Sequence, residues 1–117
     1  MLEIDIEDGA EYTLCRPVGE LDAYTVGQFR ESLAELASRP RLLIDLSSVS
    51  FIDSAGLGAL IGGIRRTREL GGDVAVCCNR APLVRLLHTT GFDRIVTVAD
   101  SVAEAAASLS DDQAANT

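Results

Sequence analysis

The sequence predicts an α/β domain with a single mixed β-sheet of about five strands, an N-terminal antiparallel hairpin and about four helices. Three observations lead to this prediction. Near the start of the chain, two short stretches of alternating apolar and polar residues flank an Asp-Gly turn, which is typical of a hairpin. Beyond them, segments with helical apolar spacing alternate with short apolar runs, as in a sheet covered by helices. The total of 117 residues fits one domain.

The hairpin should occupy the start of the chain. Apolar residues alternate with acidic ones from Leu2 to Ile6 and predict the first strand, and residues 12–18 predict the second strand after a turn at Asp8-Gly9. Residues 19–22, with the sequence GELD, are expected to form a further turn. Asp22 is expected to cap the first helix, because its carboxylate can accept hydrogen bonds from the amides of the first helical turn.

The remaining elements alternate along the chain. The first helix should run from about Tyr24 to Ser38, because its apolar residues recur every three or four positions, and Pro40 helps to end it. The next boundaries are a loop at 47–51, a Gly-Gly helix stop at 71–72 and a proline helix start at 82. Strands are expected at 42–46, 73–78 and 95–98. Helices are expected at 55–70, 82–88 and 102–109. The domain is expected to span residues 1–110, and the polar residues 111–117 are expected to form a disordered tail.

The charge of the chain limits its possible functions. The net charge of -8 combines 18 acidic residues with 10 basic ones, all of which are arginine. The absence of lysine excludes a P-loop lysine, a Schiff-base lysine and a lysine-rich phosphate-binding stripe. With two Tyr, three Phe and no Trp, the chain also lacks the basic groove and stacking aromatics of a nucleic-acid-binding protein. Its partner is therefore expected to be a protein.

The N-terminal stretch is acidic and alternating, unlike a secretory signal, and no apolar run approaches the roughly 20 residues that cross a bilayer. We expect a cytoplasmic protein without membrane insertion.

Few residues offer metal or redox chemistry. Cys15, Cys77 and Cys78 lack metal-ligand spacing and are expected to be small buried residues, with the adjacent pair pointing to opposite faces of a strand. A redox disulfide from Cys15 stays open as an alternative. The lone His88 is expected at the surface or as a cap near a helix end.

The stretch FIDSAGLGALIG, residues 51–62, begins a predicted helix with a charged and a hydroxyl residue and then carries several glycines. A glycine in a helix costs about 1 kcal/mol relative to alanine, so helix stability does not explain them. At 100° per residue, one stripe is apolar and should pack on the sheet: Leu57, Leu60, Ile61 and Ile64. The opposite side is small and flat: Ala55, Gly58, Ala59, Gly62 and Arg66. Either another element of the same fold or a separate protein can lie against that side.

Asp53 and Ser54 have two interpretations. Both residue types are favoured as helix N-caps, where their oxygens accept hydrogen bonds from first-turn amides. Because Asp53 can cap alone, Ser54 would be an additional hydroxyl, exposed at the positive end of a helix dipole and suited to phosphorylation. A phosphate adds a charge of roughly −1.5 to −2. Beside Asp53 and Asp22, it would repel an acidic partner.

Two enzymatic interpretations fit less well. Gly56, Gly58 and Gly62 approach a dinucleotide-binding fingerprint, but they fall inside the predicted helix, and no acidic residue ends the next predicted strand. The residues around Ser54 lack the G-x-S-x-G elbow of a serine hydrolase, and only His88 could serve as its base. We therefore expect no enzyme activity and no cofactor bound by this chain.

Taken in order, these motifs resemble the STAS-domain anti-sigma factor antagonists of bacteria, also called anti-anti-sigma factors. The matching pieces are GELD at 19–22, LIDL and VSFIDSAGLG within 43–58, the Gly-Gly stop before VAV within 71–76, and VRLL followed by TGF within 84–92. They cover roughly residues 3 to 109, so the resemblance is more specific than any single motif. It implies a STAS fold. Ala55 departs from the pattern, because a second serine is common there, and this leaves Ser54 as the acceptor in the motif.

The resemblance also implies a phosphorylation-controlled partner switch that regulates transcription. In such proteins the serine after the Asp of the D-S-x-G-L motif, here Ser54, is phosphorylated by the anti-sigma factor, a serine kinase that itself binds ATP and Mg²⁺. The unphosphorylated antagonist binds the kinase and frees the sigma factor, and a metal-dependent serine phosphatase reverses the modification. The expected partner-binding residues surround the acceptor: Asp22, Asp53, Ala55, Gly56, Gly58, Ala59 and Gly62.

The alternative is a non-phosphorylated STAS adaptor subunit of a membrane lipid-transport complex. Relatives of that kind often lack the acceptor serine, whereas Ser54 lies here in a full motif. A third class, a small nucleotide-binding enzyme, would bind a dinucleotide without any partner.

Overall fold

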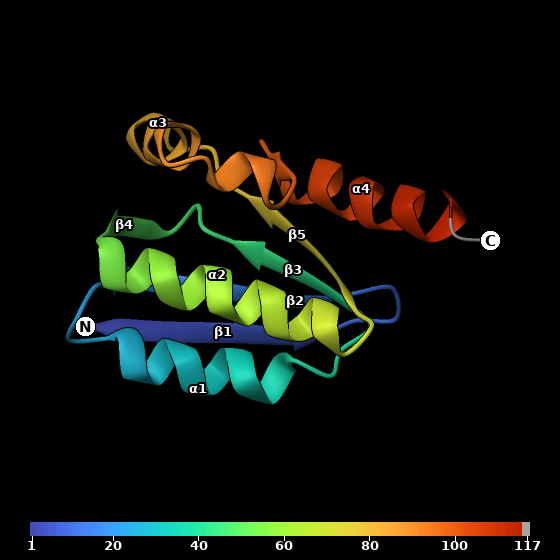
Figure 1. Cartoon of the computed structure of the whole chain (residues 1–117), viewed down its shortest axis with the longest axis horizontal. Coiled ribbons are helices and arrows are strands. Elements are labelled where there is room, and N and C mark those ends of the chain that lie inside the picture. Colours follow the sequence, from blue (N-terminus) through green and yellow to red (C-terminus); the bar gives the residue numbers. More distant parts are fainter. Residues whose placement is uncertain (116–117) are drawn as a thin grey trace.

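The computed structural model describes the backbone of residues 1–115 and the side chains of residues 1–109. Strands and helices alternate along most of the chain (Figure 1). In order, they are β1 (Leu2–Asp8), β2 (Thr13–Leu21), α1 (Val26–Leu36), β3 (Arg41–Asp45), β4 (Val49–Ile52), α2 (Ser54–Glu69), β5 (Asp73–Cys77), α3 (Ala81–Thr89), the 3-10 turn η1 (Phe92–Arg94), β6 (Val98–Ala99) and α4 (Val102–Ala115).

The strands form one mixed sheet in the order β1-β2-β3-β5-β6, with β4 paired to β2. β1 and β2 make the predicted antiparallel hairpin, and the other pairs are parallel. Over the described residues the sheet has six strands, where the sequence predicted about five. The predicted α/β class and the N-terminal hairpin are confirmed.

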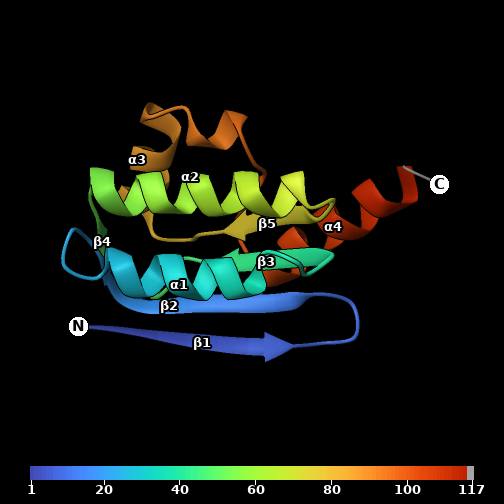
Figure 2. The same ribbon diagram turned by 60° about the horizontal axis from the view of Figure 1, so that its bottom comes forward.

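Helices cover both faces of this sheet. Figure 2 shows α1 and α2 lying side by side on one face, where Phe29, Leu33, Leu60 and Ile64 join the larger core. α4 packs on the other face, where Ala105 and Leu109 contact a smaller core. Successive residues of β3 show the alternation, because Leu42 and Ile44 belong to the larger core and Leu43 to the smaller one. The starts of α1 and α2 lie at the same end of the molecule (Figure 1).

Strand β4 lies where a loop was expected, at 47–51, so that expectation is wrong for residues 49–51. Val49 and Ile52 are buried, while Ser50 and Phe51 between them are exposed, so the sequence shows neither alternation nor an apolar run. The strand forms because the end of β2 pairs with it in parallel, from Gly19 to Leu21, with a shift in register between Gly19 and Glu20. The expected turn at 19–22 is therefore wrong for residues 19–21, which still belong to β2. Gly19 has a positive φ of 124°, and a Cβ there would collide with the Met1 carbonyl oxygen.

Two C-terminal boundaries also differ from the prediction. The strand expected at 95–98 is shorter and later, because the amides of Ile95 and Val96 still donate to the Phe92 carbonyl and keep the chain turning. Helix α4 continues to Ala115, past the expected end at Leu109, since the intervening residues include neither glycine nor proline. The expected tail thus overlaps this helix, residues 116–117 lie outside the described residues, and the domain limits stay a prediction.

The three cysteines are free thiols and are buried. Cys78 belongs to the larger core and Cys77 to the smaller one, which confirms that the adjacent pair points to opposite faces. His88 is exposed near the end of α3, with its Nδ1 2.7 Å from Asp93 Oδ2. Among the described residues, no helix combines the length and the apolarity needed to cross a membrane.

Candidate functional site at the start of helix α2

Asp53 is the N-cap of α2 and uses both of its carboxylate oxygens. Oδ1 accepts a hydrogen bond from the Gly56 amide at 2.9 Å, which satisfies one of the free amides of the first turn. Oδ2 accepts from the Ala23 amide at 3.1 Å, and the Asp53 amide donates to the Leu21 carbonyl at 3.1 Å. One side chain therefore joins the start of α2 to the segment that leads into α1.

Ser54 is the first residue of α2 and is exposed. Within the described part of the chain its hydroxyl makes no hydrogen bond, because Asp53 already provides the cap. The first-turn amides and the helix dipole give this end of α2 a partial positive charge, which stabilises an anion such as a phosphate. A free hydroxyl at the positive end of a helix is an accessible phosphate acceptor.

Asp22 lies in the turn before α1, and its expected role as the cap of that helix is wrong. The N-cap is Thr25, while the Asp22 Oδ1 accepts hydrogen bonds from the amides of Tyr24 at 2.9 Å and Thr25 at 3.1 Å. The carboxylate orders this turn, and Ala23 within it is bonded to Asp53. The structure thus brings Asp22, Asp53 and Ser54 to one end of the molecule.

The glycines of α2 divide into two groups. Gly56 is buried, and a Cβ there would collide with the Leu21 carbonyl oxygen; at Gly63 a Cβ would lie 2.5 Å from Leu33 Cδ1. At Gly58 and Gly62 a Cβ would meet nothing within 4 Å. Internal packing therefore requires Gly56 and Gly63, while contact of a separate protein with Gly58 and Gly62 stays a prediction. The first group lets the rest of the fold approach α2, and the second leaves its surface open.

Not all of the expected partner-binding residues are accessible. Gly58 and Gly62 are exposed and Ala55 is half-buried, but Ala59 is only 5% exposed and Gly56 is buried. Ala59 is nearly buried because its side of α2 faces α1, and its expected part in partner binding stays a prediction. Gly56 and Ala59 shape the site from within.

The predicted apolar stripe of α2 does face the interior. Leu60 and Ile64 are fully buried, while Leu57 and Ile61 are partly buried at the margin of the core. Gly63, which packs against Leu33, was not among the residues expected at the site. Its position seven residues after Gly56, two helical turns along the same face, was the available signal.

Two exposed aromatic residues near Ser54 were also missed. Tyr24, in the turn that Asp22 orders, is 96% exposed, and Phe51 on β4 is 50% exposed. Phe51 also lines a hollow of about 350 Å³ between β4 and α3. Exposed aromatic side chains are common in protein interfaces, so these two, in the segments that precede α1 and α2, are added to the candidate surface.

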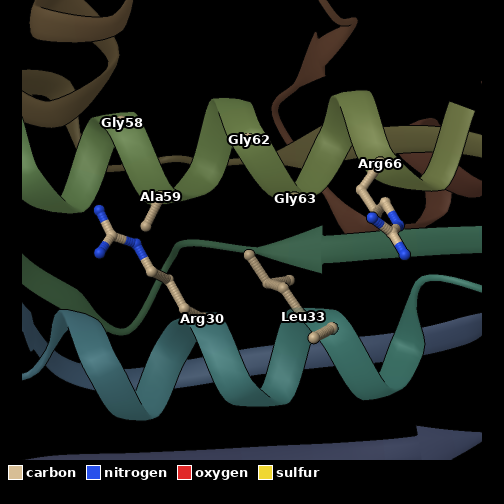
Figure 3. Close-up of a pocket in the computed structure, with 8 residues that line it drawn as sticks. Arg30, Leu33, Gly58, Ala59, Gly62, Gly63 and Arg66 are labelled. Carbon is tan, nitrogen blue, oxygen red and sulfur yellow. The ribbon is translucent and has the colours of Figure 1, made fainter. Parts of the chain in front are cut away.

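A groove of about 370 Å³ lies between α1 and α2 beside the two open glycines (Figure 3). Gly56, Gly58 and Gly62 all lie inside α2, whereas a dinucleotide-binding motif needs its first glycine in the turn before the helix. In the described part of the chain, no three His, Cys, Asp or Glu side chains are grouped so as to hold a metal ion.

Comparisons with known proteins agree with this architecture. Residues 2–105 match the family model of the STAS domain. The anti-sigma F factor antagonist of Paenibacillus polymyxa is 31% identical over 111 residues, which cover 92% of this chain and 95% of that protein. The anti-sigma-B factor antagonist of Bacillus subtilis (strain 168) is 30% identical over 98 residues, which cover 83% and 90%.

Solved structures show the same fold. An anti-sigma factor antagonist from Mycobacterium paratuberculosis has a TM-score of 0.86 at 24% identity, over 93% of this chain and 94% of that one. A Bacillus cell fate determinant in its phosphorylated form has a TM-score of 0.66 at 21% identity, over 88% and 96%. The chain therefore belongs to the STAS-domain family of anti-sigma factor antagonists.

Proposed function

We propose that this protein is a phosphorylation-controlled switch that regulates transcription in the cytoplasm. In its unphosphorylated form it binds an anti-sigma factor that is also a serine kinase, and the sigma factor is released. Phosphorylation of Ser54 ends that binding, and a serine phosphatase restores it. The observation that carries the proposal is the exposed and unbonded hydroxyl of Ser54 beside a separate cap, Asp53. The curated relatives, which are named antagonists of anti-sigma factors, support it.

In this proposal the chemistry belongs to the partner. The kinase holds ATP and Mg²⁺, the Ser54 oxygen forms a bond to the γ-phosphorus, the bond to ADP breaks, and the hydroxyl proton is released. This chain contributes the acceptor and a surface that lets the kinase approach, with Gly58 and Gly62 leaving that surface open. It needs no catalytic residue, cofactor, nucleic acid or membrane of its own.

Phosphorylation changes the charge of the surface while leaving the helix cap intact. The phosphate adds roughly −1.5 to −2 charges next to the carboxylates of Asp53 and Asp22. Because Asp53 caps α2, the hydrogen bond to the Gly56 amide is kept when Ser54 is modified. The modified surface repels acidic groups of a partner, and the bulk of the phosphate prevents close contact.

Variants of Ser54 test the switch. Ser54→Ala should bind the cognate kinase with its nucleotide as tightly as the unmodified protein, and Ser54→Asp should bind at least about tenfold more weakly, because it places a charge at the site. Isothermal titration calorimetry measures both affinities. Mass spectrometry after incubation with kinase and ATP should find one phosphate on the protein that retains Ser54 and none on the Ser54→Ala variant. Equal binding by the two variants, or modification only at another residue, contradicts the proposal.

A further inference from the structure

The open glycines of α2 border a groove whose walls carry two arginines. Arg30 comes from α1 and Arg66 from α2, and the other lining residues are small or apolar: Leu33, Ala34, Gly58, Ala59, Gly62 and Gly63. Figure 3 shows Arg30 extending toward Gly58 and Ala59 at one end, and Arg66 pointing toward α1 at the other end, with Leu33 between them. Of the described residues that line the groove, none is acidic, although the chain as a whole has a net charge of -8.

These two arginines differ from others that the fold uses. Arg16 is paired with Asp45 and Arg39 with Asp8, each at 2.9 Å. Within the described part of the chain, the side chains of Arg30 and Arg66 make no hydrogen bond or ion pair. Their guanidinium groups are free to bind an anion from outside, and the planar fork of arginine suits a carboxylate.

The groove is continuous with the proposed phosphorylation site. Ser54, Gly58, Gly62 and Arg66 are each four residues apart, so they form one ridge along α2. Arg66 comes twelve positions after Ser54, which is about 18 Å along the helix at 1.5 Å per residue. A partner segment that contacts Ser54 and follows the two glycines therefore reaches Arg66. Neither glycine is required by internal packing, and each costs the helix about 1 kcal/mol relative to alanine.

We propose that the α1–α2 groove binds an acidic stretch of polypeptide that belongs to the anti-sigma factor, with its carboxylates paired to Arg30 and Arg66. The inference rests on the proposed function, since it names the part of the partner that follows the ridge beyond Ser54. The positive charge at the groove attracts this stretch. A phosphate on Ser54, on the same ridge, repels it.

The first experiment tests the groove without the kinase. A peptide of six glutamates with blocked ends is titrated into the ¹⁵N-labelled protein at low ionic strength, with a peptide of six glutamines as the control. Amide shifts should concentrate at Arg30, Gly58, Gly62 and Arg66 with the glutamate peptide only. They should disappear in the double variant Arg30→Glu/Arg66→Glu and persist in Arg85→Glu, which changes an exposed arginine on α3. Equal shifts with both peptides, or shifts elsewhere, overturn the inference.

The second experiment uses the kinase. Arg30→Glu/Arg66→Glu should bind the kinase about tenfold more weakly than the unmodified protein, and Arg85→Glu should bind normally. Circular dichroism and thermal unfolding confirm that the variants fold. If the double variant binds normally while Ser54→Asp does not, the inference fails and the proposed switch stands. If the unmodified protein does not bind the kinase, the proposed function fails, and the peptide titration still tests the groove. A dimer of the unmodified protein that the double variant abolishes places a second copy in the groove and also overturns the inference.

Discussion

At Asp53 and Ser54, two neighbouring side chains have separate roles. The Asp53 carboxylate bonds to Gly56 in its own helix and to Ala23 in the turn before α1, and the Ser54 hydroxyl remains exposed. The sequence alone allowed either residue to be the cap, because both types are favoured at that position. The structure assigns the cap to the aspartate, so a change in the charge of Ser54 leaves the connection between the two helices in place.

Asp45 is a second carboxylate with a defined partner, and its burial has a consequence for acid stability. It is 5% exposed and accepts hydrogen bonds from Arg16 Nε and the Ser47 amide, both at 2.9 Å. Burial by itself would raise the pKa of Asp45, but the hydrogen bonds from Ser47 and Arg16 outweigh it, and the pKa is lowered. This carboxylate therefore stabilises the fold fully above its unfolded pKa of about 3.9, and the stabilisation is lost as the pH falls through the lower folded value.

Asp45→Asn should lower the free energy of unfolding by about 2 kcal/mol at pH 7, because it leaves Arg16 without its partner. It should also flatten the loss of stability on acidification below about pH 4. Urea denaturation at several pH values measures both effects. Asp100→Asn, at an exposed position, is the control and should leave the profile unchanged. The explanation fails if Asp45→Asn loses stability in acid as steeply as the unmodified protein.

At the scale of the element, α2 presents three surfaces to different surroundings. Leu60 and Ile64 face the larger core. Gly63 contacts Leu33 of α1, and the neighbouring Gly62 is open. Adjacent residues on a helix are about 100° apart, so one step in sequence moves a side chain from an internal contact to the surface. Gly62 and Gly63 are therefore a matched pair for testing which side of α2 is open and which side packs against α1.

Gly62→Ala should stabilise the protein by about 1 kcal/mol, because alanine favours a helix and its Cβ meets nothing. Gly63→Ala should destabilise it by about 1–3 kcal/mol, because the Cβ would lie 2.5 Å from Leu33 Cδ1 and force the two helices apart. Thermal unfolding compares the two.

The larger variant Gly62→Leu separates folding from binding. It should fold normally but lose binding to the kinase, because its side chain fills the surface that the partner approaches. If Gly62→Leu unfolds the protein, or if Gly62→Ala is the more damaging of the two alanine changes, the assignment of these surfaces is wrong.

At the scale of the whole molecule, the sheet separates two cores, and the cysteines are enclosed in both. Cys15 and Cys78 lie in the larger core and Cys77 in the smaller one. Burial raises the pKa of Cys15 to about 12 and, together with a hydrogen bond to Asp45, that of Cys77 to about 12. The pKa of Cys78 is also raised, chiefly by burial. Since the thiolate is the reactive form, these positions suit packing rather than redox chemistry.

The folded protein should therefore react negligibly with Ellman's reagent at pH 8, and all three thiols should react when guanidinium unfolds it. The absorbance of the released thiolate counts them. Preincubation with the reagent should leave phosphorylation of Ser54 unchanged. A thiol that reacts quickly in the folded protein would reopen the redox role that the sequence left undecided.

The sequence by itself determined the features that depend on residues near one another in the chain, namely most helices and strands and the sides that they bury. Alternation gave the hairpin strands, helical spacing gave α1 to α4, and the apolar runs gave β3 and β5, because periodicity reports which side of a segment is buried. The position of Ser54 at the start of a helix and the inward direction of Leu60 and Ile64 followed from the same reasoning.

Only the tertiary structure decided what depends on contacts between distant segments. β4 exists because β2 pairs with it, and Ala59 is buried while Gly58 is open because α1 lies against one side of α2. The α1–α2 groove, with Arg30 and Arg66 thirty-six positions apart in the chain, has no local signature. The physical reason is packing. The local sequence sets the side of the helix on which a residue lies, but the fold decides which other element packs against that side.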